Sequence, residues 1–301
     1  MVRPIGFRKN EQTAVNNFFQ EDLSVENVII NTKAQKEFDD FVKVLKDKGV
    51  QVIVVDDTNE YDTPDSIFPN NWVSFHANGT VGLYPMYAEN RRKERNEAIL
   101  EKLEDNGFLI ENIIDYTSAE EQGIYLEGTG SILLDRVHKK AYCALSERAN
   151  EELFIEFCED FDYFPVLFTA NQSVEEERLP IYHTNVMMAL GEQFVIICLD
   201  SIDDKKERKN VITHLKDSGK EIIVINEKQM HQFAGNMLQV IGENEKPFLV
   251  MSSVAFDSLR QEQLNKINMY CTIIHSSLET IETCGGGSAR CMMAEVFLPR
   301  K

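Results

Sequence analysis

The sequence predicts an α/β protein built from a repeated unit, in which a hairpin of two strands is followed by a helix and a third, buried strand. Short apolar runs occur in pairs around polar turns, and each pair is followed by a stretch with helical spacing of apolar residues. Polar landmarks also recur, because Asn71 and Glu127 are 56 residues apart (127 − 71), as are Glu127 and His183 (183 − 127). Such a period is typical of a closed or stacked array, in which matching positions converge on a common axis.

The N-terminal segment is predicted to supply a strand, a helix and a second strand. Its apolar runs at 27–30 and 51–55 have the length of short strands, and residues 34–48 between them have helical spacing. Near the other end of the sequence, the apolar run Met292–Leu298 is predicted to be a strand that pairs with the N-terminal segment and completes a fifth unit.

The first complete unit contains a strong hairpin signal. Its strands are predicted at 71–76 and 80–86, on either side of Asn78-Gly79, a dipeptide that favours two-residue hairpin turns. A helix is predicted over 92–104, because Asn106-Gly107 is a typical stop signal after helical spacing.

Three further units follow the same order. The second unit is predicted to have hairpin strands at 131–134 and 141–145, a helix at 147–158 and a third strand at 164–168. In the third unit these elements are predicted at 186–190, 194–199, 203–217 and 221–225, in the same order. In the fourth unit they are predicted at 237–241, 248–252, 257–268 and 271–275. No linker rich in proline or glycine divides the chain, so we expect residues 1–301 to form a single domain.

The composition is that of an ordinary globular protein, with 43% hydrophobic and 27% charged residues among 301. The formal net charge of −19 argues against nucleic acid as a partner, because its phosphates would repel the chain. No apolar run is long enough to cross a bilayer, and the first residues lack the apolar stretch of a secretion signal. Six cysteines are scattered rather than clustered, which suits a reducing compartment, and no CxxC or HxxxH pair offers a metal site. We therefore expect a cytoplasmic protein that needs no metal or cofactor and has no membrane partner; a homodimer remains open.

The stretch from Cys284 to Cys291 contains three consecutive glycines and ends in a cysteine. Bare glycine backbone lets a small ligand approach main-chain N–H groups closely. An ionised thiol at the end of such a loop is a nucleophile. A tight turn followed by a cysteine that merely packs fits this stretch equally well, so it does not indicate catalysis by itself.

Three other polar segments interrupt apolar surroundings at predicted strand entrances, and they contain Asp65, Glu127 and His183. Together with Cys291 they supply a thiol, an imidazole and two carboxyl groups, which are the parts of thiol catalysis. Taken singly, each has a structural alternative. His183 also fits a core histidine, Glu127 a turn cap, and Asp65 an Asx turn.

Four short motifs resemble those of the guanidine-modifying pentein superfamily and occur in the same order: Pro64-Asp65-Ser66-Ile67-Phe68, Leu126-Glu127-Gly128, His183-Thr184-Asn185 and Cys291. That superfamily includes arginine deiminases, dimethylarginine hydrolases and amidinotransferases. The resemblance extends over about residues 28–298 and is nearest to the citrulline-utilisation hydrolase branch. It implies a five-bladed, pseudo-symmetric α/β propeller of ββαβ units, which agrees with the repeat.

The resemblance also implies roles for individual residues. Cys291 would be the nucleophile and His183 the general acid and base. Glu127 would hold the histidine or a substrate nitrogen. Asp65 would bind a substrate nitrogen or line the pocket.

Two positions depart from the deiminases, which carry acidic residues where this chain has Asn71 and Asn185. Paired carboxylates clamp a cationic guanidinium, whereas an amide NH2 donates to a carbonyl oxygen. Losing two charged hydrogen bonds should weaken guanidinium binding by roughly 1.5–3 kcal/mol for each bond. The hypothesis is therefore a cysteine-dependent hydrolase that converts citrulline to ornithine, CO2 and ammonia through a covalent intermediate. The alternative is a deiminase, dimethylarginine hydrolase or amidinotransferase that acts on a guanidino substrate such as arginine.

A small amino-acid substrate needs a cationic partner for its α-carboxylate. Arg91 and Arg92 stand where the resembling hydrolases place such an arginine, and Arg148 is a second candidate. A guanidinium fork matches a carboxylate at two points. The structural alternative for Arg91 and Arg92 is a solvated helix face.

The functional alternative for the whole protein is a non-catalytic propeller that serves as a binding module. The combination of cysteine, histidine and glutamate argues against it.

Overall fold

The computed structural model describes residues 1–58 and 60–301 and contains four sheets of three strands with one shared topology. In each sheet the first two strands are antiparallel and the third is parallel to the second. The sheet of the first unit contains β3 (Val73–Phe75), β4 (Thr80–Leu83) and β5 (Asn112–Asp115), and that of the second contains β6 (Ile132–Asp135), β7 (Lys140–Leu145) and β8 (Phe164–Thr169). The sheet of the third unit contains β11 (Met188–Leu190), β12 (Phe194–Cys198) and β13 (Glu221–Ile225). The sheet of the fourth unit contains β14 (Leu238–Ile241), β15 (Pro247–Ser252) and β16 (Thr272–Ser276).

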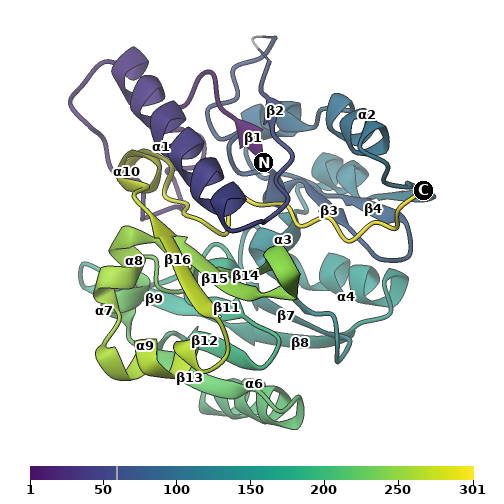
Figure 1. The fold of residues 1–301 in the computed structure, drawn as a ribbon. Helices are drawn as coiled ribbons and strands as arrows, with labels where there is room; N and C mark the ends of the chain where they lie inside the picture. Colours follow the sequence, from purple (N-terminus) through teal and green to yellow (C-terminus); the bar gives the residue numbers. More distant parts are fainter. Residues whose placement is uncertain (59) are drawn as a thin grey trace.

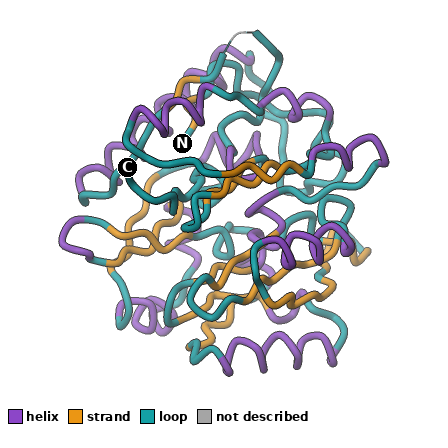
Figure 2. Tube along the Cα trace, turned by 90° about the vertical axis from the view of Figure 1, so that its right-hand side faces the viewer, coloured by secondary structure: helices purple, strands orange, loops and turns teal. Residues whose placement is uncertain are grey.

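A helical crossover joins the second and third strands of every one of these units, because two parallel strands cannot be joined by a tight turn. The crossover helices are α2 (Ala98–Asp105), α4 (Glu151–Asp160), α6 (Lys205–Asp217), and the pair α8 (Ser253–Ser258) and α9 (Gln261–Asn268). Figure 2 shows most of the helices on the outside of the strands. The predicted order of two strands, a helix and a strand is therefore present four times.

Shorter elements fill the connections. They are the hairpin of β9 (Asn171–Val174) and β10 (Glu177–Pro180), the single-turn helix α7 (Glu227–Met230), and the 3-10 turns η2 (Glu89–Glu94), η3 (Thr117–Gln122), η4 (Leu199–Ser201) and η5 (Glu243–Glu245). Arg91 and Arg92 lie in η2, so the helix predicted over 92–104 is divided and only its second half belongs to α2.

The N-terminal unit has a parallel pair of strands, β1 (Val2–Arg3) and β2 (Val55–Asp56), joined by the long helix α1 (Asn27–Asp47). The predicted strand at 27–30 is wrong, because these residues form the first turn of α1. Ile30 lies on the same helical stripe as Ala34 and Phe38, and all three are buried. A run of four apolar residues is too short to distinguish a strand from the start of a helix.

The chain after the glycines of 285–287 does not form the predicted strand. Helix α10 (Glu279–Gly285) ends there, and residues 293–299 are extended without strand pairing. A cavity separates them from the N-terminal strands, with Val52 and Val296 among the residues that line it. The segment instead crosses to the first unit, where Leu109 N donates to Pro299 O at 2.8 Å (Figure 1). The fifth unit thus contains two paired strands, and the five-bladed propeller stays a prediction.

Single turns at the entrances of the first three sheets pack against one another and position the site. These entry turns are η1 (Pro69–Asn71), α3 (Gly128–Ser131) and α5 (Thr184–Met187). Their approach leaves no room for side chains, since a Cβ on Gly128 would lie 2.5 Å from Asn70 O and one on Gly130 2.3 Å from Asn71 Nδ2. Gly128 also has a φ of 42°, which favours glycine.

The hydrophobic core is divided among the units. Phe154 and Phe157 of α4 belong to the cluster of the second unit, whereas Phe38 and Phe41 of α1 pack with residues of the fourth unit and of 289–293. Within residues 1–58 and 60–301, no helix has the length and apolar character needed to span a bilayer.

A substitution at Gly242 tests the packing between the end of α1 and the β14–β15 hairpin. An added Cβ would lie 2.4 Å from the carbonyl oxygen of Lys48, and the adjacent Glu243 N–H bonds that same oxygen at 3.1 Å. We expect Gly242→Ala to lower the free energy of unfolding by about 1–3 kcal/mol, as overpacking does, measured by urea denaturation. Gly6→Ala is the control, because its Cβ would meet no atom within 4 Å. Equal stability of the two variants would contradict this packing.

Candidate functional site

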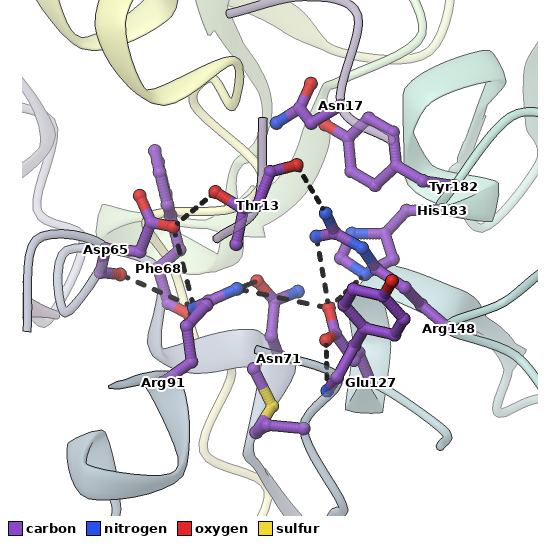
Figure 3. Close-up of polar contacts among 12 residues, drawn as sticks. Thr13, Asn17, Asp65, Phe68, Asn71, Arg91, Glu127, Arg148, Tyr182 and His183 are labelled. Carbon is purple, nitrogen blue, oxygen red and sulfur yellow. Dashed lines mark hydrogen bonds and ion pairs between the residues drawn. The ribbon is translucent and has the colours of Figure 1, made fainter. Parts of the chain in front are cut away.

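A small cavity lies beside the entry turns and encloses about 260 Å³ of space, part of it open to solvent. It is lined by Thr13, Asn17, Asp65, Phe68, Asn71, Arg91, Arg148, Tyr182, His183, Gly285, Gly287 and Cys291. Figure 3 shows the polar contacts among most of these residues. Of the predicted residues, Cys291, His183, Asp65, Asn71, Arg91 and Arg148 therefore share one cavity.

The imidazole of His183 is held by Glu127, with 2.7 Å between Nε2 and Oε2. Glu127 stands immediately before α3 and His183 immediately before α5, which is the same position in successive units. The other carboxylate oxygen of Glu127 accepts a bond of 3.0 Å from Tyr87 N. The spacing of 56 residues thus reflects two matching entry turns whose side chains meet.

The protonation states of this pair follow from its surroundings. Burial acts to raise the pKa of Glu127, but the charge of Arg148 and the hydrogen bond with His183 outweigh it and lower that pKa to about 2. Burial lowers the pKa of His183 to about 4, against the opposing effect of Glu127. At neutral pH the carboxylate is ionised and the imidazole is neutral. Because the carboxylate can only accept, we assign the ring proton to Nε2, which leaves Nδ1 able to accept a proton.

The thiol of Cys291 is 3% exposed and accepts hydrogen bonds from two amides. Asn236 Nδ2 lies 3.2 Å from the sulfur, and Asn185 Nδ2 lies 3.4 Å from it. The glycines before the thiol serve close packing, since a Cβ on Gly287 would lie 2.9 Å from the ring of Phe68. The thiol of Cys291 and the imidazole of His183 therefore border the same space in a site with little room for water.

Among residues 1–58 and 60–301, two buried polar atoms of the lining residues lack a hydrogen-bond partner, Oδ1 of Asp65 and Nδ2 of Asn71. Oδ1 of Asn185, which contacts Cys291 but does not line the cavity, also lacks one. Asp65 Oδ2, by contrast, accepts from Asn10 at 2.7 Å and from Thr13 at 3.1 Å. Buried polar groups are normally satisfied, so unpaired atoms beside a cavity indicate a ligand. Two of them are acceptors and one is a donor.

The three candidate arginines have different environments. All three nitrogens of the Arg91 guanidinium donate hydrogen bonds. Nε donates to Oε1 of Glu94 at 2.8 Å and Nη2 to Oε2 of Glu94 at 2.9 Å, and Nη1 donates to Oδ1 of Asn71 at 2.9 Å. Burial raises the pKa of Glu94 to about 8, although Arg91 opposes that effect. Arg92 does not line the cavity, and its Nε donates to a backbone carbonyl at 3.0 Å.

Arg148 lines the cavity and keeps one nitrogen free of hydrogen bonds among the described residues. Its Nη2 donates to Thr13 O at 2.9 Å, and its Nε donates to Asn16 at 2.9 Å. Its Nη1 has only a longer ion-pair contact, 3.6 Å from Oε2 of Glu127. Arg148 is therefore the arginine with donor capacity left for a ligand.

Sequence reasoning missed two groups of site residues. Thr13 and Asn17 reach the cavity from an N-terminal loop that carries no periodic signal. Asn236 had only a weak signal, because it lies 51 residues after Asn185 (236 − 185) and 55 before Cys291 (291 − 236), which is near but not equal to the spacing of 56 between the landmarks. As for metals, the part of the chain that the structure describes contains no group of three or more His, Cys, Asp or Glu side chains that could hold an ion.

Comparisons with known proteins show the family and the fold. A sequence profile of the family described as N,N dimethylarginine dimethylhydrolase, eukaryotic, matches residues 3–298. A search of curated proteins found no match. Among solved structures, apo ArgZ, an arginine dihydrolase from the ornithine-ammonia cycle in cyanobacteria, superposes with a TM-score of 0.75 at 16% identity. That match covers 100% of this chain but 40% of ArgZ, so this chain spans less than half of that protein.

Two shorter structures match over most of their length. The N-terminal domain of ArgZ with bound product has a TM-score of 0.72 at 16% identity and covers 99% of this chain and 98% of its own. A dimethylarginine dimethylaminohydrolase variant, as its adduct with S-methyl-L-thiocitrulline, has a TM-score of 0.61 at 15% identity. This match covers 97% of this chain and 96% of the dimethylaminohydrolase chain. At these identities the likeness concerns the fold, which is the mixed α/β fold of the penteins.

The lowered pKa of His183 predicts an acid-sensitive fold. Between pH 6.5 and 4 the imidazole of the unfolded chain binds a proton, whereas the imidazole of the folded chain does not. The contribution of His183 to the free energy of unfolding is therefore complete above pH 6.5 and is lost by about pH 4. The contribution is on the order of 3 kcal/mol. Urea denaturation followed by circular dichroism at pH 7.5 and 4.5 should show a smaller pH-dependent loss for His183→Gln than for the natural sequence. Identical losses would disprove the assignment.

Proposed function

The chain belongs to the family described as N,N dimethylarginine dimethylhydrolase, eukaryotic, within the guanidine-modifying pentein superfamily, and on this basis we propose that it is a cysteine-dependent hydrolase of an arginine-class guanidino substrate. The names of its relatives refer to arginine or dimethylarginine. They favour the guanidino alternative over the citrulline hypothesis.

The unpaired Oδ1 of Asp65 is the observation that carries the proposal. A guanidinium group offers only N–H donors, so a buried carboxylate oxygen without a partner is the acceptor it needs. Asp65 borders the same cavity as Cys291 and His183. Asn185, whose Nδ2 lies 3.4 Å from the sulfur of Cys291, carries a second unpaired acceptor in its Oδ1.

The reaction proceeds in two steps in this proposal. The thiol proton of Cys291 passes to Nδ1 of His183, and the sulfur attacks the central guanidino carbon to form a C–S bond. One C–N bond then breaks, and the leaving nitrogen takes the proton from the imidazole. A water that the imidazole deprotonates next attacks the carbon, the C–S bond breaks, and the ureido product leaves. Glu127 keeps the imidazole oriented and stabilises its transient positive charge.

A ureido substrate such as citrulline is the second candidate, and Asn71 favours it. Its Nδ2 is a buried donor without a partner, and a ureido group has a carbonyl oxygen to accept from it. One site with both acceptors and a donor can hold a guanidino group and then its ureido product. The cyanobacterial relative is named an arginine dihydrolase.

The proposal also covers the whole chain. Residues 1–301 form one catalytic domain, since the family profile extends over 3–298. The parallel pair β1–β2 with α1 corresponds to the last two strands and the helix of each other unit, which supports a fifth blade. Arg148 binds the substrate α-carboxylate through its free Nη1. The expected location is the cytoplasm, and the expected partner is a small amino acid.

A substrate panel tests this function. The protein is incubated with arginine, N,N-dimethylarginine, citrulline, agmatine and carbamoyl-putrescine, and the released ureido products, ornithine, amines and ammonia are quantified by mass spectrometry. We expect turnover of an arginine-class compound and a loss of about 10³-fold or more in kcat for Cys291→Ser. Cys284→Ser is the matched control, because its thiol is buried outside the cavity. Turnover of citrulline alone would select the second candidate, and turnover of nothing would refute an enzyme.

The role of Arg148 can be separated from that of its neighbours. Lysine lacks the second donor of the guanidinium fork, so Arg148→Lys should raise KM for an amino-acid substrate about tenfold. Agmatine, which lacks the carboxylate, should show no such rise. Arg208→Lys on α6 serves as the control. An equal effect on both substrates would mean that Arg148 acts on the fold or on Glu127 instead.

A further inference from the structure

The sulfur of Cys291 is surrounded by donors. Asn236 Nδ2 is 3.2 Å from it and Asn185 Nδ2 is 3.4 Å from it. Two other buried thiols, Cys143 and Cys271, instead donate to backbone carbonyl oxygens at 3.9 and 3.8 Å. Among the hydrogen bonds of residues 1–58 and 60–301, the sulfur of Cys291 accepts two and donates none. Donors favour an anion, whereas acceptors favour the neutral thiol.

The amide of Asn236 can present only its donor side to the sulfur. Its Oδ1 accepts from the backbone N–H groups of Arg290 at 3.0 Å and Cys291 at 3.4 Å. Its Nδ2 also donates to the carbonyl oxygen of Asn185 at 3.0 Å. If the amide were flipped, Oδ1 would face the carbonyl oxygen of Asn185. Its NH2 group would then face the backbone N–H groups of Arg290 and Cys291. The hydrogen-bond network therefore fixes the orientation.

The backbone around Asn236 is equally constrained. Its N–H donates to Phe233 O at 2.8 Å. A Cβ on the preceding Gly235 would lie 2.2 Å from Val186 O, so the chain here is pressed against α5. The side chain is 2% exposed. Donors held in place before the reaction need no reorganisation when charge develops.

We propose that Asn236 is a further catalytic residue, whose amide stabilises the sulfur of Cys291 as an anion. The inference rests on the proposed function, which makes this sulfur the reacting atom. When the thiol ionises, the S–H bond breaks, the proton passes to the imidazole of His183 or to water, and the electron pair stays on sulfur. That pair forms the C–S bond during attack and returns to sulfur when water displaces the product, so the same N–H stabilises the nucleophile and the leaving group.

The experiment measures the thiol without substrate. Iodoacetamide alkylation of Cys291 is followed from pH 5 to 10 by mass spectrometry of its peptide. Asn236→Ala should raise the midpoint of the pH–rate profile by about one pH unit, which corresponds to about tenfold slower alkylation at pH 7. Asn236→Asp keeps the shape of the side chain and the oxygen that accepts from Arg290 and Cys291, and it replaces only the donor. Its midpoint should rise at least as far, because an anion replaces the donor.

Asn150→Ala is the matched control, because it removes the N-cap of α4 and weakens the fold without touching the sulfur. Its midpoint should equal that of the natural sequence. The inference is overturned if both Asn236 variants keep the original midpoint, or if alkylation merely slows at every pH. A midpoint shift in a protein that hydrolyses no guanidino or ureido compound would refute the proposed function alone. Hydrolysis without a shift would refute the inference alone.

Discussion

The close approach of the entry turns is the constraint on which the rest of the site depends. Gly128 and Gly130 let α3 come within contact distance of η1, and Gly130 also faces His183, where an added Cβ would lie 2.8 Å from Nδ1. A side chain at Gly128 would collide with the backbone of η1, and one at Gly130 would displace the side chains of Asn71 and His183. A displacement of an ångström is enough to break the bond of 2.7 Å between Glu127 and His183. The geometry of the candidate site thus depends on how closely the entry turns pack.

Burying charge beside these turns is expensive unless every charge is compensated. Asp65, Glu94 and Glu127 are buried with Arg91 and Arg148, which leaves three acids against two cations. The pKa values show how the imbalance is borne: that of Glu127 is held at about 2, whereas burial raises that of Glu94 to about 8. A pKa of about 8 keeps Glu94 protonated at neutral pH, so Glu127 and Asp65 are the buried carboxyl groups left to face the two arginines. Burial also raises the pKa of Asp65, against the effect of Arg91. The buried cluster therefore carries no excess of negative charge.

The sequence was most informative where local signals and the repeat coincide. Hairpins around turns such as Asn78-Gly79, the crossover helices and the four polar segments could all be predicted, because their periods and turn residues are local. The resemblance added the superfamily and suggested roles for Cys291 and His183. The preference for citrulline came from two amides considered in isolation. In the structure Asn71 gives its oxygen to Arg91 and keeps its NH2 unpaired, whereas Asn185 turns its NH2 toward the sulfur and leaves its oxygen unpaired, so only Asn71 still offers a donor.

Other features could not be read from local signals. The apolar run at 27–30 has the composition of a strand, and only the helical stripe that continues to Phe38 shows that it begins α1. Residues 293–299 include the apolar run predicted as a strand, yet they form no regular secondary structure. Thr13 and Asn17 lie in a loop whose position depends on tertiary contacts alone. Asn236 reaches the sulfur only because the fourth unit brings it there.

The cavity joins residues that are far apart along the chain. Asn17 donates to the carbonyl oxygen of Gly285, a contact across 268 positions, and Tyr182 bonds the next carbonyl across 104. Contacts of such separation close large loops and form late in folding. A nascent polypeptide can therefore assemble its individual hairpins and helices well before the cavity exists, because the cavity needs nearly all of the chain in its final place.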